Sequence, residues 1–114
     1  MTRAPFIAAF VALLAFGPTL VKAGPAPGSG PITVRIDNFA FDAQTVTVSP
    51  GARVTWVNED DAPHTVVAED GKSFRSRVLD TGERFSFTFA SPGTWGYFCS
   101  VHPHMTGKVV VKAP

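Results

Sequence analysis

The chain has 114 residues, a length that suits one domain. Hydrophobic residues make up 45% of it and charged residues 17%, and the formal net charge at pH 7 is only +1. Because there is no basic stripe and no basic helix, the charge pattern excludes the usual features of a nucleic-acid-binding protein.

The first 23 residues have the parts of a signal peptide. Arg3 gives a positive start, an apolar run follows at 6–16, and the segment ends in Val21-Lys22-Ala23. The apolar run is too short to cross a bilayer. We therefore expect cleavage after Ala23, with an uncleaved membrane anchor as the alternative.

Cleavage would leave residues 24–114, exported to the periplasm or beyond, with no segment inserted in a membrane. Loss of Arg3 and Lys22 would leave eight Lys and Arg against nine Asp and Glu, a net charge of −1. The Gly- and Pro-rich stretch 24–31 is typical of a flexible leader, and 32–114 would form the single domain.

Cysteines of exported proteins normally pair as disulfides. We expect the only cysteine, Cys99, to pair between chains, to react or to bind a metal.

Short runs with β-branched and aromatic residues follow the leader, and Pro-Gly turns such as Pro50-Gly51 separate some of them. About seven strands are expected, at 32–37, 44–49, 53–58, 64–69, 84–89, 94–99 and 107–112. Their regular spacing predicts an antiparallel β-sandwich or barrel. The segment 71–83 could hold a turn of helix or an edge strand. The aromatic residues are expected in the core: Trp56, Phe85, Phe87, Phe89 and Trp95.

Metal-binding side chains gather in the stretch "YFCSVHPHMTGKVVV" near the end of the chain. Cys99, His102 and Met105 follow one another at intervals of three residues, a spacing that lets one tight loop aim all three at a single point. Pro103 stiffens that loop. The remaining ligand must come from elsewhere, and His64 is the one histidine outside this stretch.

The combination of donors favours copper. A thiolate and two imidazoles suit several metals, but a thioether is a poor ligand for Zn²⁺ and a good weak axial ligand for copper. Attachment of a c-type haem would need a Cys-x-x-Cys-His run, which is absent. Two His, one Cys and an axial Met form a blue-copper electron-transfer site. Cys99 must bind as thiolate, so metal binding releases a proton.

The stretches "NEDDAPHTV" and "GTWGYFCSVHPHMTGKVVV" resemble the cupredoxins, and most closely their amicyanin branch with its short Cys-x-x-His-x-x-Met loop. The resemblance covers 32–112. It implies an all-β, Greek-key β-sandwich of seven to eight strands that binds one copper ion. Carried over by position, the copper ligands would be His64, Cys99, His102 and Met105.

The chain departs from the amicyanin pattern beside the ligands. Thr65 stands where amicyanins usually have Asn, and Ser100, Val101 and His104 replace Thr, Pro and Phe of their loop. Since neighbours of the ligands set the redox potential, these changes leave the potential and the partner open. His104 is expected to be an exposed loop residue; a titratable group beside His102, or a transient second metal contact, are the alternatives.

The expected function is soluble periplasmic electron transfer, one copper cycling between Cu(I) and Cu(II). As the resemblance implies, His102 would be the exit for the electron, ringed by apolar residues such as Pro103 and Pro63. Redox proteins would be transient partners of a monomer. The alternative is periplasmic copper storage or delivery. An enzyme is not expected, because the ligand set leaves no open position for a substrate.

The acidic run Glu59-Asp60-Asp61 precedes His64. Such a run is usually a solvated loop. Near the copper it could instead steer a positively charged partner.

Overall fold

The computed structural model describes residues 30–114. The expected signal peptide 1–23 and residues 24–29 of the expected leader lie outside the described residues. Within residues 30–114, no helix has the length and apolar character needed to span a membrane.

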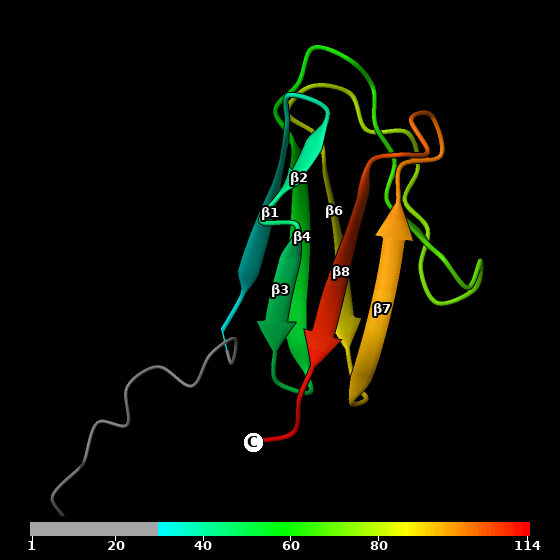
Figure 1. Ribbon diagram of the computed structural model, residues 1–114. Coiled ribbons are helices and arrows are strands. Elements are labelled where there is room, and N and C mark those ends of the chain that lie inside the picture. The colour runs from blue at the N-terminus through cyan, green and yellow to red at the C-terminus, as the bar shows by residue number, and fades with distance from the viewer. Residues whose placement is uncertain (1–29) are drawn as a thin grey trace, which may run out of the picture.

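Eight strands form two four-stranded sheets that face each other (Figure 1). The order is β2-β1-β4-β6 in one sheet and β3-β8-β7-β5 in the other. The predicted all-β sandwich is therefore confirmed. The strands are β1 (Ile32–Asp37), β2 (Ala40–Asp42), β3 (Thr45–Val48), β4 (Ala52–Asn58), β5 (Val67–Ala68), β6 (Arg84–Phe89), β7 (Gly93–Phe98) and β8 (Thr106–Val111).

The sheets are mixed, not purely antiparallel as predicted. β1 runs parallel to β4, and β3 runs parallel to β8, whereas the other neighbours are antiparallel. Alternation of apolar and polar residues shows which face of a strand is buried. It carries no information on the direction of the neighbouring strand, so this error could not be avoided from the pattern.

Two local expectations also change. The three-residue strand β2 was not predicted, and the run expected at 64–69 is regular only at β5. The segment 71–83 is neither a helix nor a continuous strand. It lies against β5 and the chain just before it through two isolated bridges, Leu79 with His64 and Arg75 with Val67.

The core fills the space between the sheets. Trp56 and Phe89 are buried as expected, while Phe85, Phe87 and Trp95 are half-buried and pack against the core from its margin. The largest fully buried side chains come from both sheets and from the segment 71–83: Trp56, Tyr97, Phe89, Ile36 and Leu79. Such close-packed interiors deform little. The sandwich is therefore a stiff support for the loops at its ends.

Three connections meet at one end of the sandwich: the β1–β2 turn, the β4–β5 segment and the β7–β8 loop (Figure 1). The C-terminus lies at the opposite end. Every candidate ligand belongs to the second or the third of these connections.

Candidate metal centre

The β7–β8 loop carries three candidate ligands. Cys99 follows β7 directly, and its N–H donates to the carbonyl of Met105 at 3.0 Å, so the strand pairing extends into the loop. Inside this closure, His102 N–H donates to the Cys99 carbonyl at 3.2 Å and Met105 N–H to the His102 carbonyl at 2.9 Å. Cys99 and Met105 are buried, and His102 is half-buried. These backbone hydrogen bonds therefore fix the three positions relative to one another.

His64 comes from the β4–β5 segment and is fully buried. Its backbone exchanges two hydrogen bonds with Leu79. The N–H of His64 donates to the Leu79 carbonyl at 3.1 Å, and the N–H of Leu79 donates to the His64 carbonyl at 2.7 Å. The segment 71–83, which the sequence left unassigned, thus anchors this ligand position.

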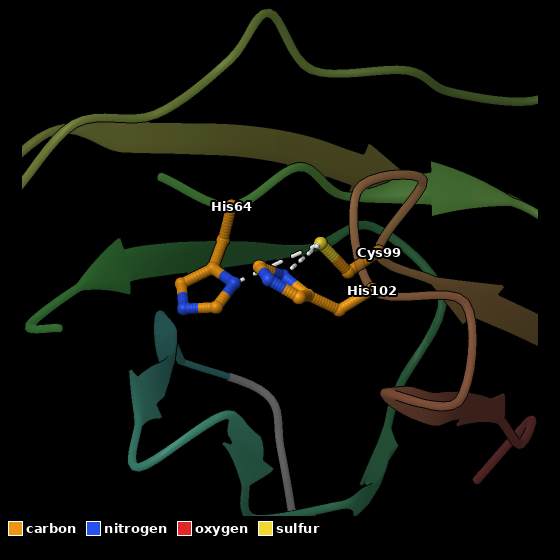
Figure 2. Close-up of side chains that lie close together, drawn as sticks. All are labelled: His64, Cys99 and His102. Atoms are coloured by element: carbon orange, nitrogen blue, oxygen red, sulfur yellow. Dashed lines mark hydrogen bonds between the residues drawn. The ribbon is translucent and has the colours of Figure 1, made fainter. Parts of the chain in front are cut away.

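The donor atoms of His64, Cys99 and His102 converge (Figure 2). All three lie within 4.8 Å of one another. Cys99 Sγ is 3.7 Å from His64 Nδ1 and 3.8 Å from His102 Nδ1. Met105 is also buried, at the end of the same loop.

These separations fit ligands of one metal ion. Metal–sulfur and metal–nitrogen bonds of about 2.3 and 2.0–2.1 Å, as Zn²⁺ forms them, place the two ligand atoms roughly 3.7 Å apart at an angle of ~115°. The chemistry of the donors then selects among metals. One thiolate, two imidazoles and the thioether carried by the same loop fit copper better than a structural zinc site, which takes four strong donors.

Cys99 is poised to bind as a thiolate. Burial by itself would raise the pKa of its thiol, but the N–H of Thr65 and the imidazoles of His64 and His102 outweigh it, and together they lower the pKa to about 6. Thr65 N–H donates to Cys99 Sγ at 3.4 Å. The site therefore favours the deprotonated form that a metal needs.

Thr65 joins the two segments that carry the candidate ligands. Its Oγ1 accepts from Ser100 N–H at 2.8 Å and lies 2.7 Å from Ser100 Oγ. Both residues depart from the amicyanin pattern, yet their hydroxyls meet across the site. Thr65 thus ties the segment of His64 to the loop of Cys99.

Asp60 points inward and is not part of an exposed acidic surface. Only 8% of it is exposed, and its Oδ2 lies 2.7 Å from His64 Nε2. Burial opposes its ionisation, but hydrogen bonds from Phe39, His64 and Asn38 outweigh that effect and lower the pKa of Asp60.

The other two acidic residues of the run differ from Asp60. The carboxylate of Glu59 accepts from the Nε of Arg35 at 2.7 Å, so its charge is already paired. Asp61 is exposed. The run Glu59-Asp60-Asp61 is therefore not the uniformly solvated loop that the sequence suggested.

Phe39 is a site residue that sequence reasoning missed. It is 52% exposed, and its ring packs edge-on against His64 at 5.4 Å and His102 at 5.0 Å between centroids. The stretch "DNFAF" offers only Asn38 as a weak turn signal. Nothing in it indicates that the following aromatic reaches across to the histidines.

His104 is exposed and stands outside the converging group. It lines a small recess together with Phe39, Gln44 and Met105. Its exposure agrees with the expected loop residue.

Comparison with known proteins decides the family. The model described as "Copper binding proteins, plastocyanin/azurin family" matches residues 29–112. The chain belongs to this family. Amicyanin-alpha of Methylorubrum extorquens is 34% identical over 110 residues, which cover 93% of this chain and 92% of that protein.

Solved structures agree with this membership of the plastocyanin/azurin family. A Cu(I) structure of a mutant amicyanin superposes with a TM-score of 0.67 and 30% identity, covering 72% of this chain and 82% of that one. A copper-containing nitrite reductase of Thermus scotoductus superposes with a TM-score of 0.68 and 33% identity. The match covers 74% of this chain but only 23% of the reductase. The chain is thus similar to one part of that larger protein.

The cofactor predicted from the sequence is confirmed, because the plastocyanin/azurin family binds copper. His64, Cys99, His102 and Met105 are positioned as a copper site at the end of the sandwich.

Proposed function

We propose that this protein is a periplasmic electron carrier with one copper ion held by His64, Cys99, His102 and Met105. The observation that carries the proposal is the convergence of two imidazole nitrogens on one thiolate sulfur, with separations of 3.7 and 3.8 Å. Copper, when bound, supplies a one-electron Cu(I)/Cu(II) change.

The protein's part is to keep the ligands still while the charge changes. Backbone hydrogen bonds fix Cys99, His102 and Met105 within the loop, and Leu79 fixes His64. Thr65 ties the two segments together. Ligands that move little between oxidation states keep the reorganisation energy low, which favours rapid electron transfer.

His102 is the proposed point of exit for the electron. It is half-buried, whereas His64 is fully buried, so its ring comes nearest to solvent. Exposed apolar side chains adjoin it: Phe39 packs against its ring, and Val101, 48% exposed, precedes it in the chain. A redox protein docking here would form a small, short-lived contact with a monomeric carrier.

Copper storage or delivery is the second candidate, since a member of this family could hold copper for transfer. The anchored ligand set argues against it, because a delivery protein must release its metal. An enzymatic role has less support. A substrate would need a cavity next to the metal-binding residues. The surface recess of about 520 Å³ is lined by Gln44, Glu69 and Lys108 among others, and none of the four proposed ligands lines it.

The proposed compartment rests on the N-terminal sequence, the positive start and short apolar run before Ala23. Mass spectrometry of the exported protein tests this part. A chain beginning at Gly24 supports the proposal, and an intact Met1 contradicts it.

The absorption spectrum of the oxidised, copper-loaded protein tests the proposed site. We expect an intense visible band from Cu(II)–thiolate charge transfer, lost in Cys99→Ser. His104→Phe is the matched control, since it changes an exposed residue of the same loop and should keep the band.

Voltammetry then separates carrier from delivery protein. A reversible one-electron wave, with copper retained over many cycles, supports the carrier. Loss of copper on reduction favours delivery, and a colourless protein that binds Zn²⁺ would contradict both.

A further inference from the structure

Asp60 is a buried carboxylate that accepts three hydrogen bonds at once. His64 Nε2 lies 2.7 Å from its Oδ2, the N–H of Phe39 donates to the same oxygen at 2.9 Å, and the N–H of Asn38 donates to Oδ1 at 2.6 Å. Each donor comes from one of the connections that meet at the metal-binding end, the β1–β2 turn or the β4–β5 segment.

The backbone of Asp60 is held as well. Its N–H donates to Asn58 Oδ1 at 2.9 Å, and its carbonyl accepts the hydroxyl of Thr81. Asn58 is itself buried at the end of β4 and donates to the carbonyls of Ala62 and Leu79. The carboxylate therefore has little freedom to turn away from His64.

The contact with Asp60 decides which nitrogen of His64 carries the proton. An ionised carboxylate only accepts hydrogen bonds, so Nε2 must be the protonated nitrogen. Nδ1 is then left with a free lone pair, and this is the atom that faces Cys99 Sγ. The carboxylate also makes the imidazole a stronger donor, which favours Cu(II) over Cu(I).

The same carboxylate holds an unusual turn. Asn38 and Phe39 have φ values of 51° and 56°, a left-handed conformation that is uncommon for residues other than glycine. Both of their N–H groups end on Asp60. This turn places the Phe39 ring edge-on against His64 and His102.

We propose that Asp60 is a positioning residue that presents Nδ1 of His64 to the copper and, through the same carboxylate, holds the Phe39 turn over both histidines. The proposal deepens the proposed electron-transfer function and rests on it. One side chain would then set both the donor strength of a ligand and the shape of the surface where a partner docks.

Asp60→Asn tests the proposal, with Asp61→Asn as the control that removes the same charge from the exposed neighbour. Because an amide has one acceptor oxygen, Asp60→Asn cannot satisfy all three donors. Loss of such an outer partner typically lowers metal affinity about 10- to 100-fold. We expect Cu(II) affinity to fall by this factor and Cu(I) affinity to fall less.

The midpoint potential should therefore become more positive, by about 59 mV for each tenfold difference between the two affinities. Hydrogen exchange at the amides of Asn38 and Phe39 should also become faster. Asp61→Asn should change the midpoint potential and the exchange rates of these two amides much less than Asp60→Asn does. Equal potentials and equal exchange rates in the two variants would overturn the proposal.

A measurement on the unaltered, copper-free protein decides the point even if Asp60→Asn fails to fold. Long-range ¹H–¹⁵N correlation should find the His64 proton on Nε2, and a proton on Nδ1 would overturn the proposal. Failure of the proposed function would show separately, as absence of the copper–thiolate band in the wild-type protein.

Discussion

Thr65 acts on the site with two different atoms. Its backbone N–H donates to the Cys99 sulfur, which stabilises the thiolate. Its hydroxyl oxygen accepts a hydrogen bond from the N–H of Ser100. Ser100 follows Cys99 directly, so the contact with Ser100 fixes the ligand loop, and the same hydroxyl also donates to Cys99 Sγ at 3.8 Å. Because only the hydroxyl depends on the side chain, substitution can separate the hydroxyl contacts from the backbone contact.

Thr65→Val should keep the backbone N–H contact to the thiolate and lose the hydroxyl contacts to Cys99 and Ser100 that link the two segments. Ser100 N–H then loses its protein acceptor, and because Ser100 is exposed the loss is that of an ordinary hydrogen bond, about 0.5–1.5 kcal/mol. We expect the free energy of unfolding to fall by about that amount while the copper–thiolate band persists. Chemical denaturation and absorption measure the two effects.

Thr47→Val provides the control, since it makes the same change at an exposed position of β3. An equal loss of stability in both variants would show that the hydroxyl of Thr65 has no special role.

The sequence was most informative about residues that carry their own chemistry. A single cysteine with histidine and methionine at three-residue spacing in a β-rich chain that is expected to be exported indicates copper whatever the details of the fold. Asp60 and Phe39 could not be found in this way. Carboxylates and aromatic residues are common on surfaces and in cores, and the role of these two depends on a turn and a segment that meet only in the folded protein.

At the level of elements, the β7–β8 hairpin is the part that presents the site. Its pairing continues to Phe98 and Thr106, so the ligand loop emerges from a regular ladder. Gly107 lies opposite Tyr97 in this ladder, and a Cβ added to Gly107 would come within 2.5 Å of the tyrosine ring and hydroxyl. The ring of Tyr97 therefore occupies the space that a larger residue at 107 would need.

Gly107→Ala should strain this hairpin. Tyr97 is fully buried and cannot swing outward, and overpacking of this kind typically costs about 1–3 kcal/mol. Thermal unfolding of the copper-free protein measures the loss. Lys108→Ala, at the exposed next position of β8, should change stability by less than about 0.5 kcal/mol. Equal stability of the two variants would contradict the packing argument.

The strands were predictable where alternation is sustained, and β1 and β6 begin and end at the expected residues. Prediction failed where tertiary contacts replace local pattern. β2 has only three residues, too few for alternation to be recognised, and 71–83 is held by single bridges and by hydrogen bonds to distant carbonyls. The parallel pairs were missed because they depend on how the chain crosses between sheets.

On the scale of the whole molecule, Tyr97 reports on the integrity of the core. It is the only tyrosine of the sequence, and it lies between the sheets with its ring edge-on to Trp56. Burial raises its pKa to about 12 from an ordinary value of 10.0, while the indole of Trp56 acts weakly in the opposite direction. Ionisation of Tyr97 is thus coupled to unfolding.

This coupling predicts alkaline sensitivity. Between pH 10 and 12 the unfolded chain has lost the tyrosine proton and the folded chain retains it, so stability falls as pH rises. The tyrosine contribution lost over this interval is on the order of 2–3 kcal/mol. Tyr97→Phe should lack this part of the decline. Near-ultraviolet absorbance of tyrosinate gives the pKa directly, and an ordinary value in the folded protein would contradict the prediction.

The place of β8 has a consequence for biosynthesis. It is the last strand along the sequence, yet it lies inside its sheet between β3 and β7. While the ribosome is still making the chain, β3 and β7 both lack the neighbour that covers their edges, and the sandwich cannot close. The sandwich can therefore close only after β8 itself has been made, and the open form that persists until then is the form that the proposed export through a secretion channel would require.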